Sequence, residues 1–236
     1  MITTNQPKIF QGEIVAAVSS LPEGNMKEIN MPSEVTINVD RDREALLKSL
    51  GIGLDQTVLA NITYDRDDYN RYHTVNPDDQ GKGILPGTDI EVYDALMTSQ
   101  PGVALFLPLA DCVGAILYDP TKKVLMVSHL GRHNIEQQGA LRSVEYMKDN
   151  ADIDPNNLKV WLSPSAGKEN YPLFAFDNKS QQDVVLEQLK AAGVSDANIE
   201  TANIDTTTSE DYFSHSQYLK DNSKPNGRFA IVAMLK

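Results

Sequence analysis

The chain has 236 residues, of which 41% are hydrophobic and 23% charged, a balance typical of a folded globular protein rather than a disordered one. Its formal net charge of −12 argues against nucleic acid or an anionic membrane surface as a partner, because both attract basic faces. A single cysteine excludes an internal disulfide bond. The N-terminus lacks the pattern of a signal peptide, and no apolar run approaches the roughly 18 residues of a membrane span. We therefore expect a cytoplasmic protein.

The first part of the chain predicts strands, one helix and a long polar loop. The strands are expected at residues 13–19, 34–39 and 57–63. Residues 41–50 have the apolar spacing of a helix, and Gly51 follows as a stop signal. Residues 65–87 are rich in Asp, Asn, Pro and Gly and contain His73. A loop of that length inside a compact domain is usually functional or disordered.

The rest of the chain alternates apolar runs with helical patterns. Strands are predicted at residues 103–109, 113–118, 123–128, 158–162, 198–204 and 228–235, and helices at residues 134–148 and 180–192. Alternating strands and helices, together with hairpins, favour an α+β or mixed α/β sandwich over a purely parallel sheet. No shift in composition marks a boundary, so residues 1–236 are expected to form one domain.

The candidate chemistry lies around the single cysteine. Cys112 follows an apolar run in Leu109-Ala110-Asp111-Cys112, and His129 ends a later one. A thiol and imidazoles delivered from strand ends suit either a zinc site or a cysteine nucleophile. The competing interpretation is a buried structural cysteine, because cysteine packs as a small hydrophobe. The Asp111 carboxylate needs a partner if it is buried, because an unpaired buried charge is costly.

Two further positions are candidates on weaker patterns. Arg132 and His133 precede a predicted helix. They are expected to form an anion site and to supply most of the positive potential at its mouth. The alternative is a solvated basic turn. His73 and His215, taken alone, are typical of surface histidines. No C-x-x-C, H-E-x-x-H, P-loop or G-x-S-x-G motif is present, so the residues alone indicate a possible Cys/His site and leave its chemistry open.

The same positions resemble a known family. Residues 109–120 resemble the T-A-D-C-x-P-[VI]-L-L-x-D-P segment of the laccase-domain proteins, and residues 128–133 resemble their [VA]-H-A-G-W-R segment. Arg71-Tyr72-His73 takes the place of their Q-V-H, and residues 87–89 resemble their G-A-D-[AG] element. This family was first labelled multicopper polyphenol oxidoreductase laccase and is now described as zinc-dependent purine nucleoside phosphorylase; the older label is the weaker interpretation.

The resemblance implies a four-layer α/β/β/α sandwich with mixed β-sheets and a site between the sheets. It implies a catalytic zinc ion, the cofactor, held by His73, Cys112 and His129. Three further residues are expected to bind the substrate: Asp111, Arg132 and His133. The implied reaction is phosphorolysis of adenosine- or inosine-type nucleosides to free base and ribose 1-phosphate, with adenosine deamination as a second activity. The expected partners are therefore a small nucleoside and phosphate, bound by a monomer or small homo-oligomer.

The chain also departs from the family pattern. H-A-G-W-R becomes residues 129–133, His-Leu-Gly-Arg-His, and F-S-Y-R becomes residues 213–216, Phe-Ser-His-Ser. Two alternatives therefore stay open. One is a metal-free cysteine hydrolase or deamidase with Cys112 as nucleophile and His129 as base, since fold alone does not determine function. The other is a divergent member that retains the metal site and has lost activity.

Overall fold

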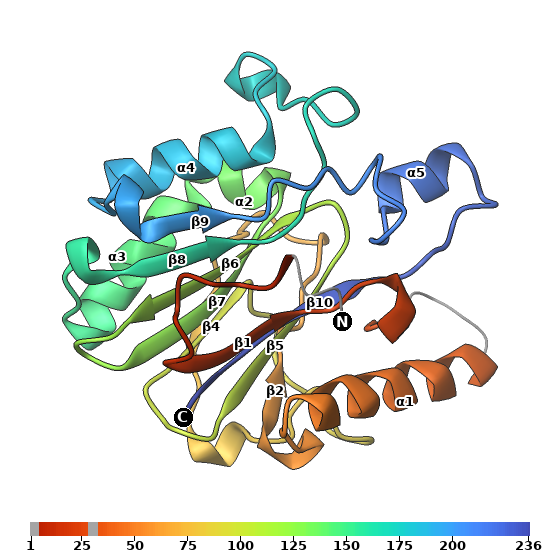
Figure 1. Ribbon diagram of the computed structural model, residues 1–236, viewed down its shortest axis with the longest axis horizontal. Coiled ribbons are helices and arrows are strands. Elements are labelled where there is room, and N and C mark those ends of the chain that lie inside the picture. Colours follow the sequence, from red (N-terminus) through yellow and green to blue (C-terminus); the bar gives the residue numbers. More distant parts are fainter. Residues whose placement is uncertain (1–4, 28–32) are drawn as a thin grey trace.

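The computed structural model of the protein describes residues 5–27 and 33–236, with side chains from residue 38 onward in the second range. Two β-sheets pack face to face and carry helices on their outer faces (Figure 1). The strands are β1 (Ile14–Val18), β2 (Thr57–Leu59), β3 (Tyr72–Thr74), β4 (Ala95–Thr98), β5 (Ala104–Leu109), β6 (Val113–Asp119), β7 (Val124–Leu130), β8 (Lys159–Leu162), β9 (Ile199–Thr201) and β10 (Phe229–Leu235). The α-helices are α1 (Ser33–Ser49), α2 (Arg132–Glu136), α3 (Gly139–Ala151), α4 (Gln181–Ala191) and α5 (His215–Lys220).

Both sheets are mixed. The four-stranded sheet has the order β1-β10-β5-β2, and the six-stranded sheet has the order β3-β4-β7-β6-β8-β9. The pairs β2/β5, β3/β4 and β8/β9 are parallel, and the other pairs are antiparallel. The predicted fold class, an α/β/β/α sandwich of mixed sheets, is confirmed.

The central strands are buried on both faces, which explains why β5, β6 and β7 are continuous apolar runs without polar alternation. Leu107 of β5 and Ile116 of β6 belong to the core between the sheets. Phe106 of β5 points the other way and packs in a cluster with Leu47 of α1. The outer face of the six-stranded sheet packs on α3 and α4. Each such side chain contributes on the order of 1.5–3 kcal/mol by leaving water.

Two helical segments differ from the prediction. The strand predicted at residues 34–39 is wrong, because these residues form the first part of α1. Their β-branched alternation has the period of a strand, but β propensity is a weak preference that helical packing overrides: Val39, Leu46 and Leu47 are buried on one face. The helix predicted at residues 134–148 is interrupted between α2 and α3, where Gln138 adopts a left-handed conformation with φ of 62°.

The region between β2 and β5 also differs. The strand predicted at residues 57–63 ends at Leu59, after which the chain leaves the sheet. The predicted loop at residues 65–87 contains the short strand β3, and β4 and α5 have no counterpart in the predicted elements. Within the described ranges, none of the helices has the length and apolarity needed to cross a bilayer.

Candidate active site

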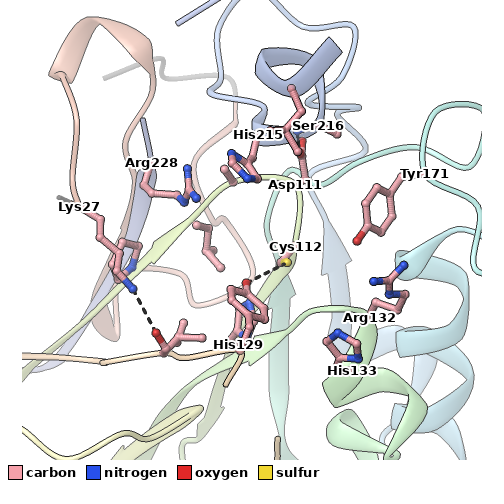
Figure 2. Close-up of a pocket in the computed structure, with 16 residues that line it drawn as sticks. Lys27, Asp111, Cys112, His129, Arg132, His133, Tyr171, His215, Ser216 and Arg228 are labelled. Carbon is pink, nitrogen blue, oxygen red and sulfur yellow. Dashed lines mark hydrogen bonds between the residues drawn. The ribbon is translucent and has the colours of Figure 1, made fainter. Parts of the chain in front are cut away.

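The turn at residues 110–112 carries the chain from one sheet to the other. β5 ends at Leu109 in the four-stranded sheet, and β6 begins at Val113 in the six-stranded sheet. His129 lies near the end of β7, opposite Gly114 of β6, and Arg228 directly precedes β10. Strand ends from both sheets therefore meet at one edge, where a cavity of about 690 Å³ opens (Figure 2).

Cys112 and His129 approach the same point in this cavity. A Cβ atom at Gly131 would lie 2.9 Å from Cys112 Sγ and 3.2 Å from His129 Nε2. Gly131 has a φ of −80°, which any residue can adopt, so the glycine is needed for space and not for backbone conformation. The absence of a side chain at Gly131 therefore allows the thiol and the imidazole to lie close to the backbone at the same point.

Burial holds both groups of this pair neutral. Burial raises the pKa of the Cys112 thiol to about 11, and the Asp111 charge raises it further. Burial lowers the pKa of His129 to about 3, and the Lys27 charge also lowers it. His129 Nδ1 is buried and has no hydrogen-bond partner among the described residues. The pair is thus a thiol and a neutral imidazole, unlike the thiolate of an activated cysteine nucleophile.

Cationic side chains flank the pair. Lys27, Arg132 and Arg228 line the cavity, and none of them forms an ion pair with a carboxylate in the part of the chain that the structure describes. Lys27 Nζ donates a hydrogen bond to the Ile62 carbonyl at 3.3 Å. Figure 2 shows Lys27 and Arg228 on one side of Cys112, and Arg132 on the other. A chain with a net charge of −12 therefore places three cationic side chains at this one cavity.

The structure places both predicted anion-site residues, Arg132 and His133, at this cavity. The His133 ring stacks on Tyr69 with ring centroids 4.7 Å apart, and its Nδ1 lies 3.6 Å from the Glu136 carboxylate. The negative charge of Glu136 therefore offsets part of the positive potential that was predicted for the turn at Arg132 and His133. Lys27 was missing from the sequence prediction because no motif surrounds it.

Asp111 holds the turn that presents Cys112. Its Oδ1 accepts a hydrogen bond from Thr206 Oγ1 at 2.7 Å, and its Oδ2 accepts one from the Ser216 backbone N–H at 2.7 Å. Its backbone carbonyl accepts a further hydrogen bond from Gln181 Nε2 at 2.9 Å. Both carboxylate oxygens therefore help to position the turn, and contact of Asp111 with a substrate stays a prediction.

His73 lies away from the cavity. It belongs to β3, and β4 separates β3 from β7, which carries His129. His73 Nε2 is 3.0 Å from Asp79 Oδ2, and its ring stacks on Tyr93 at a centroid distance of 4.6 Å. The prediction that His73 converges with Cys112 and His129 is wrong, because parallel pairing with β4 fixes His73 on the edge strand of the sheet.

The described residues do not fit the zinc site that the resemblance implied. Cys112 and His129 are two donors, whereas a catalytic zinc site uses about three protein ligands. Among the residues that the structure describes, no group of three or more His, Cys, Asp or Glu side chains is placed to hold a metal ion. The segment that enters the cavity after β2 brings Ile62 and Tyr64, and Tyr64 Oη lies 4.0 Å from Cys112 Sγ. In the described part of the chain, no third ligand takes the place of His73.

His215 lines the cavity, whereas the sequence pattern alone predicted a surface histidine. It is the first residue of α5, and its Nδ1 is buried without a hydrogen-bond partner among the described residues. Burial lowers its pKa, and the Arg228 charge lowers it further. The signal that could have identified it is its place in the Phe-Ser-His-Ser segment, one of the elements that resemble the laccase-domain proteins.

The fold and the cavity define a two-sheet sandwich protein with a Cys–His pair at the junction of its sheets. The family model described as multi-copper polyphenol oxidoreductase laccase matches residues 18–185, and the chain belongs to this family. The solved structure of YlmD from Geobacillus stearothermophilus has a TM-score of 0.82 at 21% identity, over 98% of this chain and 94% of that one. The Bacillus licheniformis hypothetical protein YfiH has a TM-score of 0.81 at 21% identity, over 94% and 93%. These two likenesses establish the fold.

Curated relatives carry the name purine nucleoside phosphorylase. YlmD of Bacillus subtilis (strain 168) is 27% identical over 159 residues, which are 67% of this chain and 53% of that protein. LACC1 of Mus musculus is 34% identical over 84 residues, which are 36% of this chain and 20% of that protein. The matched stretch thus spans about half of the first relative and less of the second.

Proposed function

We propose that the protein is a nucleoside phosphorylase that cleaves adenosine- or inosine-type nucleosides with phosphate at the Cys112–His129 cavity. The observation that carries the proposal is the set of cations around this pair, which have no carboxylate partner among the described residues, in a chain with a net charge of −12. An anionic co-substrate is repelled by the exterior and attracted here. The names of the curated relatives support the same reaction class.

Phosphorolysis requires a site for phosphate, a surface for the base and a proton donor for the leaving base, and this cavity has side chains suited to each role. A phosphate oxygen attacks C1′ of the ribose while the glycosidic C–N bond breaks, and the electron pair of that bond leaves with the base. Lys27, Arg132 and Arg228 would hold the phosphate through charge-assisted hydrogen bonds. Tyr171 offers an aromatic wall for the base, and the Cys112 thiol, which burial keeps protonated, is a proton donor for the departing nitrogen.

A metal-free hydrolase or deamidase is the second candidate, and the approach of both Cys112 Sγ and the His129 ring to Gly131 favours it. In that reaction Cys112 Sγ would attack an amide or amidine carbon after passing its proton to His129. The neutral state of the pair argues for the first candidate, because a nucleophilic cysteine needs its thiolate.

Base release from a nucleoside panel tests the proposal. The purified protein is incubated with adenosine, inosine and guanosine, with and without phosphate, and the free bases are quantified by chromatography. We expect phosphate-dependent release that falls at least about a hundredfold in Cys112→Ala, because a lost proton donor costs that much. The melting temperature of this variant should stay close to the parent's, since Cys112 is only half-buried. Base release that is absent for every nucleoside, or equal in Cys112→Ala, would contradict the proposal.

A further inference from the structure

Two cationic side chains, those of Lys27 and Arg228, supply positive charge next to the Cys112–His129 pair. Lys27 and Arg228 line the same cavity and lie on the same side of the pair (Figure 2). The Lys27 ammonium donates to one carbonyl, that of Ile62, and this leaves donor capacity for a ligand, because an ammonium group has three hydrogens.

The same arrangement disfavours a divalent cation. Among the residues that the structure describes, Cys112 and His129 are the metal-type donors beside Gly131, no third one completes a metal site, and His73 pairs with Asp79. The Asp111 carboxylate is occupied by Thr206 and Ser216. A metal ion here would lack a third protein ligand and would face the like charges of Lys27 and Arg228, whose repulsion is weakly screened in a partly buried cavity.

We propose that Lys27 and Arg228 form an oxyanion site that holds phosphate beside the Cys112–His129 pair without a metal ion. Lys27 supplies a point charge, and Arg228 supplies a planar group that can bind two phosphate oxygens at once. Arg132, on the opposite wall, faces the same cavity from α2 and adds to the potential there. The identity of the anion rests on the proposed phosphorolysis, whereas the site itself rests on the geometry of the cations.

Phosphate binding without nucleoside tests the site directly. Inorganic phosphate is titrated into the whole protein by calorimetry, with Lys27→Met, Lys27→Arg and Lys148→Met as variants. Lys148 is exposed in the last turn of α3, away from the cavity, and serves as the matched control. We expect Lys27→Met to weaken phosphate binding by on the order of tenfold to a hundredfold, Lys27→Arg to restore most of it, and Lys148→Met to leave it unchanged. Parent-like phosphate affinity in Lys27→Met would overturn the site.

Metal content provides the second arm. The protein is equilibrated with zinc chloride, dialysed and analysed for bound metal, and the phosphate titration is repeated after treatment with a chelator. We expect far less than one zinc per chain and an unchanged phosphate affinity. Stoichiometric zinc that disappears in His129→Gln, or phosphate binding that is lost with the chelator, would overturn the metal-free site.

The outcomes separate this site from the proposed reaction. Phosphate binding that depends on Lys27, in a protein that releases no base from any nucleoside, would support the oxyanion site and reject phosphorolysis. Phosphate-dependent base release, together with an unchanged phosphate affinity in Lys27→Met, would reject the oxyanion site and support phosphorolysis.

Discussion

Gly131→Ala is expected to lower base release by at least about a hundredfold, because displacing reacting groups by about 1 Å has effects of that size. The new methyl group would lie 2.9 Å from Cys112 Sγ and 3.0 Å from His129 Cε1, so one of these side chains must move. The backbone itself tolerates alanine at a φ of −80°, so the melting temperature should fall little. Steady-state kinetics and a thermal melt on the same preparation measure both effects.

Gly87→Ala is the matched control for this substitution. Gly87 has a φ of +75° and open space around its missing side chain. Alanine there is strained by about 1 kcal/mol and touches nothing in the cavity. We expect the opposite profile, a lower melting temperature with unchanged turnover. Parent-like turnover in Gly131→Ala would show that Cys112 and His129 are not at the reacting centre.

Asp111→Ala is expected to lower the free energy of unfolding by about 3 kcal/mol or more, because two hydrogen bonds to a buried charge are lost. The Thr206 hydroxyl and the Ser216 N–H would each lose their acceptor. Asp111 also has a φ of 69°, a left-handed conformation that alanine adopts less readily than aspartate. Urea denaturation followed by circular dichroism measures the loss.

Two variants accompany Asp111→Ala. Asp111→Asn keeps a side-chain oxygen and tolerates the left-handed conformation, so its loss of stability should be smaller. Asp149→Ala, at an exposed position of α3, should leave stability unchanged. An Asp111→Ala protein as stable as the parent, with impaired substrate affinity, would contradict the positioning role and support the predicted contact of Asp111 with substrate.

The central strands and the helix at residues 181–191 could be predicted from sequence because local patterns determine them. β5, β6 and β7 are predominantly apolar and are bounded by turn residues, and Ser180 caps α4 through a hydrogen bond from the Asp183 N–H. The strand predicted at residues 34–39 was wrong because the prediction followed the alternation of β-branched residues in the sequence. That alternation does not exclude a helix, since tertiary packing can override β propensity.

The candidate site was only partly predictable. Cys112 and His129 belong to recognisable local segments, and the turn and β7 bring both to the cavity. His73 was assigned to the site from a three-residue segment. Its position in the structure is set by the pairing of β3 with β4, and no local sequence pattern predicts that pairing. Lys27 and Arg228 are about 200 residues apart in sequence and meet because β10 runs between β1 and β5. Such a pairing follows from sheet topology, which is assembled from distant parts of the chain.

Phosphorus NMR of a reaction with inosine and inorganic phosphate distinguishes phosphorolysis from hydrolysis at this cavity. A phosphorylase consumes inorganic phosphate as hypoxanthine appears and builds up the signal of ribose 1-phosphate in equal amount. We expect this signal with the parent protein and its loss in Gly131→Ala. Hypoxanthine released with free ribose, at a constant phosphate signal, would contradict phosphorolysis and identify the cavity as the site of a hydrolase.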